Sequence, residues 1–582
     1  MRDSLKTLLS TVIKSNAIIV AIVYTLSWGL ICFNKGIYWD DWIWFNVDHS
    51  VLLRSMSQAG FLWFGWFHNF MLSFQHSILL YRCLVFFSFF VSAFLLYAIL
   101  KTIKETTVFS RFFIVTLFSI FPVNNSRVAL SVSQYALCYA LFFAGFWLLS
   151  RFIDKRNIAV RVLSLLLLFL SFTTNSFLVF YCVPIGYLLY REKENIKSPS
   201  KFIHTAFLYL DYFLLPFLFW FIKQSFFVPY GIYKGYNNLQ VANILQNSFH
   251  LLLSIKNSFF DVVTISLQAV SVGAVIMALL LFIFFVIRFN TASQYTIRFK
   301  TSCVFFVLGI GTLILSLIPY VLVGQIPSVT DWNSRHQLLV PLGACLILFY
   351  GVELLLSKFH KFKLLAYCIF IALFVNLNIH YCLAYQKDWY KQVSLREAFK
   401  ESKTIKDNTM FVFTDETTGM NANDRIYRSY EYTGIMAQAL NEKTRLGFDI
   451  RLFNDENKGI ASAIEKKSTT ESFYRLMYLI DNYVLKDKPD CKIQIKHQLY
   501  DTVNTRSKGF SFYIKSWFKK LVHYSSSENQ DIFVSTNSLN NKLYTIDTKR
   551  TLSLLYYDYF NHEKFLIEIK KLITLDYLSY TN

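Results

Sequence analysis

Long apolar segments recur along this chain as far as residue 384 and then stop. A membrane-spanning helix needs about 20 consecutive, mainly apolar residues, and most of these segments approach or exceed that length. The pattern predicts a polytopic α-helical membrane protein with about 11 spans. We place the spans at residues 15–33, 76–100, 108–122, 134–150, 158–173, 175–190, 203–222, 261–287, 301–323, 338–356 and 364–384.

The polar remainder of the chain is predicted to be a separate C-terminal domain. Runs of β-branched and aromatic residues alternate there with helical periodicity, which favours an α/β fold. We predict strands near 409–415, 491–499, 510–516, 531–535 and 542–547, and helices near 421–440, 470–485 and 549–574. The chain thus divides into a membrane domain, residues 1–384, and an α/β domain, residues 385–582.

Charge fixes the expected orientation. The formal net charge of +21 lies mostly in residues 1–384, which carry +16. With the N-terminus in the cytoplasm, 20 of the 28 Lys and Arg residues of this part fall on cytoplasmic connections and 7 on the outer side, as the positive-inside rule requires. Basic residues beside apolar spans indicate the lipid bilayer as a partner and no nucleic acid.

This orientation places the larger polar parts on the outer side. The first apolar segment has no small-residue cleavage site before Trp39, so we expect a retained signal anchor. An odd number of spans then puts the C-terminal domain outside, together with the loops 34–75, 223–260 and 324–337. The cytoplasmic connections are short and basic, so a functional site is expected on the outer face.

Few carboxylates lie on that face of the membrane domain. They are Asp40, Asp41, Asp48, Asp261 and Asp331. Asp40 and Asp41 are adjacent, and aromatic residues surround them in the segment 36–44, just after the first span. Partial burial and a neighbouring like charge both raise the proton affinity of a carboxylate, as a general base requires. The alternative is a solvated loop whose Trp and Tyr belong to the interfacial aromatic belt.

A first span, an acidic pair just beyond it and a multi-span body with a polar outer tail together resemble the GT-C glycosyltransferases, membrane enzymes that use polyprenyl-phosphate sugars. In that class the first carboxylate of the acidic motif commonly acts as catalytic base. The resemblance therefore implies this role for Asp40, with Asp41 second. Within the class, the size and the outer tail look most like bacterial glucosyltransferases that decorate O antigens and related surface polysaccharides.

The resemblance implies an inverting hexosyltransferase of the bacterial inner membrane. It would move a sugar from undecaprenyl phosphate to a surface glycan on the periplasmic side. Such a reaction also needs cations for the departing phosphate. The candidates are Arg335, whose guanidinium matches phosphate in two-point geometry, and His336, Arg127 and Lys234. Arg335 could instead be paired with Asp331 alone.

Other functions remain as alternatives. A flippase, transporter or polymerase of lipid-linked sugars should carry charged residues inside its spans, where we find little beyond Arg82, Asp211 and Glu353. A non-enzymatic envelope scaffold is a third reading. The chain has no G-x-x-x-x-G-K-[ST] loop for ATP and no D-x-D pair for a metal-bound sugar nucleotide, so we expect no cofactor and no metal. In the C-terminal domain, Asp415 and Glu416 follow a predicted strand.

Overall fold

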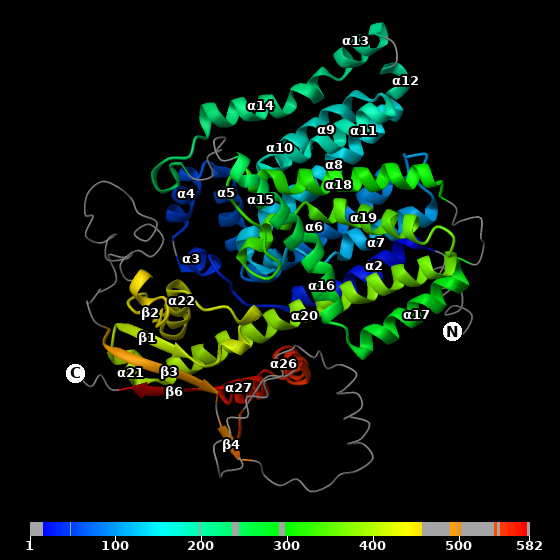
Figure 1. Ribbon diagram of the computed structural model, residues 1–582. Helices are drawn as coiled ribbons and strands as arrows, with labels where there is room; N and C mark the ends of the chain where they lie inside the picture. The colour runs from blue at the N-terminus through cyan, green and yellow to red at the C-terminus, as the bar shows by residue number, and fades with distance from the viewer. Residues whose placement is uncertain are drawn as a thin grey trace.

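The computed structural model describes residues 15–46, 48–196, 199–235, 244–289, 297–456, 489–497, 499–501, 541–543 and 548–578. It is a bundle of helices joined to a smaller domain that contains a sheet (Figure 1). The helices that precede the sheet are α2 (Asn16–Trp28), α3 (Asp41–Asn46), α4 (His49–Gln58), α5 (Leu62–Leu72), α6 (Ser77–Leu100), α7 (Val108–Ile120), α8 (Ser133–Lys155), α9 (Ile158–Ser171), α10 (Ser176–Phe180), α11 (Cys182–Arg191), α12 (Lys193–Ile196), α13 (Pro199–Leu208), α14 (Leu210–Phe226), α15 (Ile244–Ile255), α16 (Asp261–Gln268), α17 (Val272–Arg288), α18 (Phe299–Val321), α19 (Val340–Leu355), α20 (His360–Glu401) and α21 (Lys403–Asp407).

Several of these helices are long and apolar enough to cross a membrane. Within the described residues there are five by length and composition, or six if the bent pair α16–α17 counts as one span. They are Asn16–Phe33, Ser77–Leu100, Leu130–Lys155, Phe299–Val321 and Lys361–Glu401. Shorter apolar helices occupy four other predicted positions, namely Val108–Ile120, Ile158–Ser171, Ser176–Arg191 and Val340–Leu355. The structure is therefore that of a helical membrane protein, and the number eleven stays a prediction.

The predicted span 261–287 is broken in its middle. Helices α16 and α17 meet at an angle of 103°. Asn376 of α20 closes the break, because its Nδ2 donates to the Ala269 carbonyl (2.7 Å) and its Oδ1 accepts from Ser271 Oγ (2.9 Å). The Ser271 hydroxyl in turn accepts from the Ala274 amide and caps α17. Backbone groups that a straight helix would pair are thus satisfied by side chains, as a membrane interior requires.

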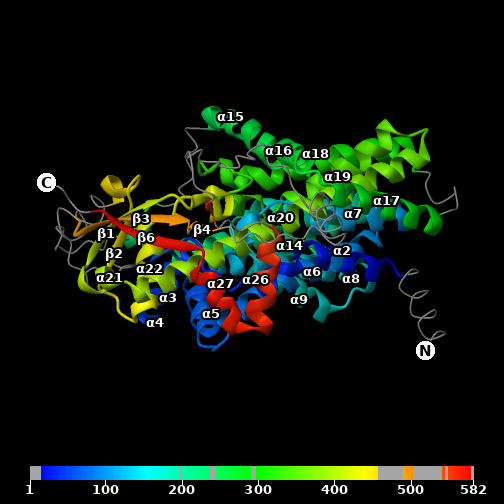
Figure 2. The same cartoon turned by 90° about the horizontal axis from the view of Figure 1, so that it is seen from below.

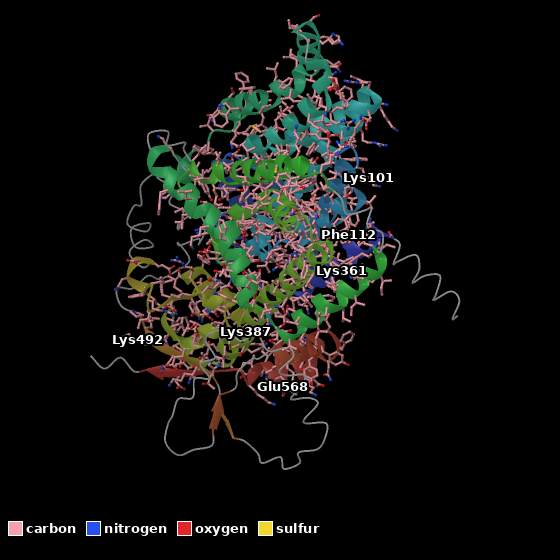
Figure 3. The ribbon with its side chains drawn as sticks, turned by 45° about the vertical axis from the view of Figure 1, so that its right-hand side comes forward. Lys101, Phe112, Lys361, Lys387, Lys492 and Glu568 are labelled. Carbon is pink, nitrogen blue, oxygen red and sulfur yellow. The ribbon has the colours of Figure 1, made fainter. Side chains whose placement is uncertain are left out.

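Side chains fill the space between the helices (Figure 3), and many of the buried ones are aromatic. Phe112 and Phe113 of α7 are fully buried and pack against Phe285 and Phe289 beside the end of α17. Large rings bury much apolar area and pack in tilted or edge-on pairs. Contacts between Phe side chains therefore contribute to the packing of these helices.

The connections predicted to be cytoplasmic meet at one end of the bundle. Arg156 pairs with Glu192 (2.6 Å), and Arg191 pairs with Asp154 (2.5 Å). Arg161 holds Asp211 through two hydrogen bonds of 2.7 Å. Acids that lie in or next to predicted spans are thereby neutralised by basic residues of the same end.

Helix α20 joins the two parts of the protein. It is one helix of 42 residues and runs without interruption through the predicted boundary at 384/385. At 1.5 Å per residue it is about 63 Å long, roughly twice the bilayer's hydrocarbon core. Its first half lies among the membrane helices, and its second half packs against α22 and β6 of the C-terminal domain (Figure 2).

The described part of the C-terminal domain has the α/β character that the sequence predicts. A four-stranded sheet has the order β2-β1-β3-β6, in which β1 is parallel to β2 and β3, and β6 is antiparallel to β3. A separate pair, β4-β5, is antiparallel. The elements are β1 (Met410–Asp415), α22 (Ser429–Leu440), β2 (Leu446–Asp449), β3 (Cys491–His497), β4 (Leu499–Asp501), β5 (Asn541–Leu543), α26 (Thr548–Phe560), α27 (His562–Lys570) and β6 (Ile573–Leu578).

One prediction for this domain is wrong at its end. The segment 549–574 is two helices, because Asn561 ends α26 and caps α27 by accepting from the Lys564 amide (3.1 Å). Strand β6 follows and pairs with β3. The predicted helix 470–485 and the predicted strands 510–516 and 531–535 lie outside the described residues.

Candidate functional site

The acidic pair sits in a tight turn between the end of the first span and α3. Trp39 has φ 50°, a left-handed conformation that is rare for a bulky residue. The Asp41 amide donates to the Tyr38 carbonyl (3.1 Å), and the Asp40 carbonyl accepts from the Ile43 amide (3.0 Å) to start α3. The turn directs the two neighbouring carboxylates into different surroundings.

Asp41 is a buried structural acceptor. It is fully inaccessible to solvent and accepts from the amides of Leu130 (2.7 Å), Ser131 (2.8 Å) and Tyr38 (3.4 Å). Arg82, at the start of α6, contributes a nearby positive charge and itself donates to the carbonyls of the loop that precedes the pair. Burial raises the pKa of Asp41, and the amides and Arg82 oppose that rise. Asp41 therefore ties the acidic loop to the connection between α7 and α8.

Asp40 has a different environment. Its side chain is partly accessible, and within the described residues it has no hydrogen bond or ion pair. Burial raises its pKa to about 6, the positive charge of Arg335 acts to lower it, and the negative charges of Asp41 and Glu431 raise it further. A carboxylate with this proton affinity is still mostly ionised at pH 7 and is a stronger base than an ordinary Asp.

Arg335 comes from the loop before α19, and its positive charge acts on the Asp40 carboxylate. It lies in a short 3₁₀ helix, Trp332–Gln337, whose N-cap is Asp331. The guanidinium stacks over the Trp332 ring (4.4 Å to its centroid), and Nη1 donates to the Trp332 carbonyl (2.9 Å). Asp331 accepts instead from the Asn333 amide (2.7 Å) and from the Ser328 hydroxyl, so within the described residues it forms no ion pair with Arg335. The structure thus brings Asp40 and Arg335, two of the predicted residues, to one place.

Aromatic rings connect the two. The centroids of Trp39 and Trp332 are 5.3 Å apart, and Tyr385 of α20 meets Trp39 edge-on at 5.9 Å. Trp39 is 8% exposed. Trp39, Trp332 and Tyr385 together form an aromatic wall beside Asp40. The buried rings help to desolvate the Asp40 carboxylate.

The other predicted phosphate-binding residues lie elsewhere or are uncharged. His336 is buried and packs in a tilted arrangement against the Tyr320 ring (4.8 Å between centroids). Its pKa is lowered to about 3 by desolvation and then by Arg335, so it is neutral. Arg127 is 5% exposed and packs between Trp28 (3.9 Å) and Phe89 (4.4 Å) in the membrane-domain core.

Arg127 also donates to two backbone carbonyls, Asn124 (3.1 Å) and Val123 (2.8 Å). Lys234 is exposed in the loop after Gly231–Tyr233, which is fixed to α4 by a bond from the Tyr230 amide to the Gln58 carbonyl (2.9 Å). The contacts of Arg127 explain its burial without a ligand, and a ligand role for Lys234 stays a prediction.

The C-terminal domain contributes a residue that the sequence did not indicate. Arg425 lies in the loop between β1 and α22, and its guanidinium approaches Trp39 (5.3 Å) and Tyr38 (5.8 Å). It donates to Asp388 of α20 (3.2 Å) and to Glu431 (2.6 Å). Its Nη2 is buried and has no hydrogen-bond partner within the described residues. A second guanidinium therefore faces the aromatic wall next to Asp40.

The loop that carries Arg425 is strained and firmly held. Asn423 and Asp424 both have positive φ angles, 56° and 51°, and such strain persists only where the surroundings enforce it. Asn423 Nδ2 donates to the Thr330 carbonyl in the loop that also bears Arg335. Asp388 accepts from the Ala422 amide (2.9 Å) on the other side. Two distant parts of the chain thus meet over the acidic pair.

A buried ion pair anchors the base of this loop. Lys391 of α20 donates to Asp415 at the end of β1 (2.5 Å), and both side chains are fully buried. Asp415 also accepts from the Thr417 amide (2.8 Å) and hydroxyl (2.7 Å) and from Tyr432 (3.1 Å). Asp415, one of the two acids marked in the sequence, is therefore occupied in fixing the domain against α20.

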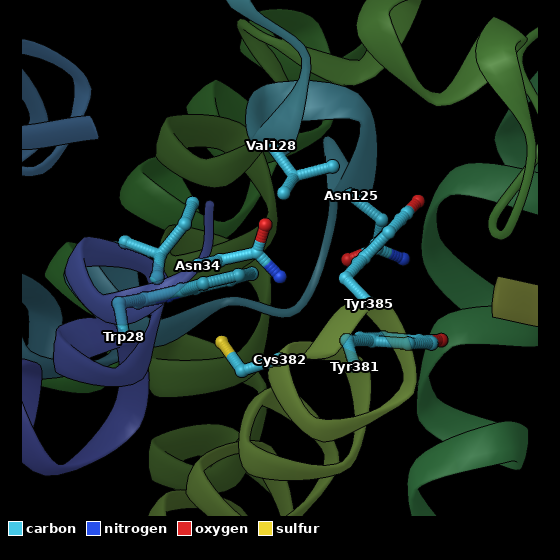
Figure 4. A pocket seen from close by; sticks show the side chains of 8 residues that line it. Trp28, Asn34, Asn125, Val128, Tyr381, Cys382 and Tyr385 are labelled. Atoms are coloured by element: carbon cyan, nitrogen blue, oxygen red, sulfur yellow. The ribbon is translucent and has the colours of Figure 1, made fainter. Parts of the chain in front are cut away.

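A narrow cavity lies between the first span, the loop after α7 and α20 (Figure 4). Its lining is Trp28, Ile31, Asn34, Asn125, Val128, Tyr381, Cys382 and Tyr385. Trp28 Nε1, Asn34 Nδ2, Asn125 Oδ1 and the Tyr385 hydroxyl are buried there without a hydrogen-bond partner among described groups. The cavity is too small for a sugar, so we assign it no substrate.

No family model and no curated protein matches the chain. Across the described ranges, no group of three or more His, Cys, Asp or Glu side chains could hold a metal ion.

Proposed function

We propose that this protein is a membrane glycosyltransferase that transfers a sugar from a polyprenyl phosphate to an acceptor hydroxyl, with Asp40 as general base. The observation that carries the proposal is the contrast within the acidic pair. Asp41 is saturated with hydrogen bonds, while Asp40 is partly exposed, has no partner within the described residues and faces Arg335 beside an aromatic wall.

The reaction assigns one task to each group. The acceptor oxygen attacks the anomeric carbon, its proton passes to Asp40, and the bond between that carbon and the phosphate oxygen breaks. The bonding electrons leave with the phosphate, whose growing charge the guanidinium groups of Arg335 and Arg425 stabilise. Attack opposite to the leaving group inverts the anomeric configuration. Trp39 and Trp332 shield the site from water.

The position of the site suits a lipid-linked donor. Asp40 follows the helix Asn16–Phe33 by seven residues, so a phosphate at the bilayer surface could reach it while the polyprenyl chain stays in the bilayer. We propose the finer topology of eleven spans in a bacterial inner membrane, with the N-terminus in the cytoplasm and the C-terminal domain in the periplasm. The basic connections that pair at the opposite end of the bundle support this orientation.

The flippase reading is weaker. Three charged residues that lie well inside predicted spans are engaged in fixed contacts. Arg82 donates to the Gly36 carbonyl (2.8 Å), Asp211 pairs with Arg161 (2.7 Å), and Glu353 pairs with Lys363 (2.6 Å). A central transport pathway would need such charges to be available to the cargo.

The experiment compares surface glycans by mass spectrometry in cells with the wild-type gene, without the gene, and with Asp40→Asn. The control is Asp48→Asn, the same change at an exposed acid of the same loop. We expect a hexose-sized mass difference that disappears on deletion and in Asp40→Asn and persists in Asp48→Asn. A glycan that is fully modified in Asp40→Asn cells would refute the assignment of the base. Identical glycans with and without the gene would refute the enzyme.

A further inference from the structure

Helix α26 presents an aromatic face to the outside of the protein. Leu552 is 44% exposed, Tyr556 59%, Tyr559 42% and Phe560 76%. These four residues fall within one face of the helix, whereas Thr551, Leu554 and Asp558 on the opposite face are buried. An exposed stripe of large apolar rings on one helix face marks a binding surface or a membrane surface.

Contacts with the first span fix where this face lies. Phe33 ends the span-capable helix Asn16–Phe33 and is itself 47% exposed. The Tyr559 hydroxyl donates to the Phe33 carbonyl (3.1 Å), and the two rings meet edge-on at 5.6 Å. Lys35, two residues beyond the span, pairs with Asp558 (2.9 Å) and lies over the Tyr559 ring (4.3 Å). The aromatic face of α26 therefore continues directly from the point where the chain leaves the membrane.

The overall arrangement agrees with that position. Figures 1 and 2 both place α26 at the edge of the C-terminal domain that adjoins the membrane helices, away from the outer strand β2. Helix α27 connects α26 to α20: Phe565 packs on Tyr390 (5.7 Å), and the Ile569 carbonyl accepts from Ser394 (3.0 Å).

We propose that α26 is an interfacial membrane anchor, whose Leu552, Tyr556, Tyr559 and Phe560 insert at the boundary between lipid headgroups and acyl chains. Tyr rings favour this zone because their bodies are apolar while their hydroxyls keep a polar partner, which for Tyr559 is the Phe33 carbonyl. Lys549 on the same face and Lys564 beyond the helix end are exposed, as cations beside lipid phosphates would be. The anchor holds the C-terminal domain at a fixed height above the bilayer, and it does not depend on the proposed glycosyl transfer.

Photocrosslinking in native membranes tests the anchor on the full-length protein. A benzophenone amino acid replaces Phe560, an aromatic exchange at an exposed site that should not disturb folding. The positive control carries the same group at Leu280 of α17, 62% exposed within the broken span, and the negative control carries it at Ile450 after β2, 44% exposed.

After irradiation, mass spectrometry of the purified protein should find phospholipid adducts at positions 560 and 280. It should find none at position 450. Adducts at 280 without adducts at 560 would overturn the proposal. A protein adduct at 560 would also overturn it and identify the face as a docking site for that protein.

Discussion

Substitution of Asp41 should lower the stability of the protein, whereas substitution of Asp40 should abolish its activity. Changing Asp41 to Ala leaves the amides of Leu130 and Ser131 buried without acceptors. Each buried amide without a partner costs about 1–3 kcal/mol, so the folded protein should lose about 2–6 kcal/mol. Asp41→Asn keeps one acceptor oxygen but turns an amide group toward a backbone N–H, which costs about 1–3 kcal/mol.

Asp40→Asn should leave stability almost unchanged. The Asp40 side chain forms no hydrogen bond or ion pair within the described residues. Its substitution removes the free-energy cost of desolvating the charge, which offsets the lost attraction to Arg335. We expect a change within about 0.5 kcal/mol, as for substitutions away from buried networks. Activity should instead be abolished, because Asn cannot accept the proton.

The measurement is the melting temperature of the purified full-length protein, recorded together with glycan modification. Asp40→Asn should melt at about the same temperature as the wild type. Asp41→Asn should melt lower, and Asp41→Ala should melt lowest. The reasoning would be refuted if Asp40→Asn melted as low as Asp41→Asn, or if Asp41→Ala melted like the wild type. Stable but inactive Asp40→Asn protein is the combination that separates catalysis from folding.

The other predictions can be measured directly. Arg335→Lys keeps the charge but loses the two-point fork and the stacking on tryptophan, so kcat/KM should fall by the equivalent of about 1–3 kcal/mol, whereas an unchanged value would return the residue to a structural role. The kcat/KM of the wild type should rise with pH through about 6, because Asp40 must be ionised to act as base. In Arg335→Gln this rise should move to higher pH, since the lost positive charge no longer lowers the pKa of Asp40, and a fixed profile would contradict their proximity. Arg425→Gln should reduce transfer far more than Arg428→Gln, because the Arg428 guanidinium is exposed. Equal effects would show that Arg425 is not part of the site. A phosphatase reporter that folds only in the periplasm should be active between α21 and β1 and inactive between α11 and α13, and the reverse result would move the site to the cytoplasm.

The helices of the membrane domain were predictable because their signal is local. A run of about 20 apolar residues specifies a helix whatever it packs against. The break between α16 and α17 was missed, although Ser271 before a helical run is a recognisable cap. The strand β6 was missed for a similar reason: residues 573–578 alternate between apolar and polar side chains, which is a strand pattern, and Asn561 marks the start of a new helix.

The candidate site was only half predictable. Asp40 and Arg335 share a property that the sequence displays, since each lies a few residues from the end of an apolar segment on the same expected side. Arg425 has no such marker. Its position depends on two residues with positive φ and on a hydrogen bond from Asn423 to a loop about 90 residues earlier, which no local pattern encodes.

Arg425 also determines what the C-terminal domain does. A loop that contains two left-handed residues is strained by about 1–3 kcal/mol for each, and this strain persists only under strong surrounding contacts. Those contacts are the buried Lys391–Asp415 pair and the Asp388–Arg425–Glu431 network, both of which depend on α20 as the continuous helix that links the domains. The strain is explained if the loop must hold a guanidinium against the aromatic wall of Asp40, and the C-terminal domain is then part of the active site that we propose.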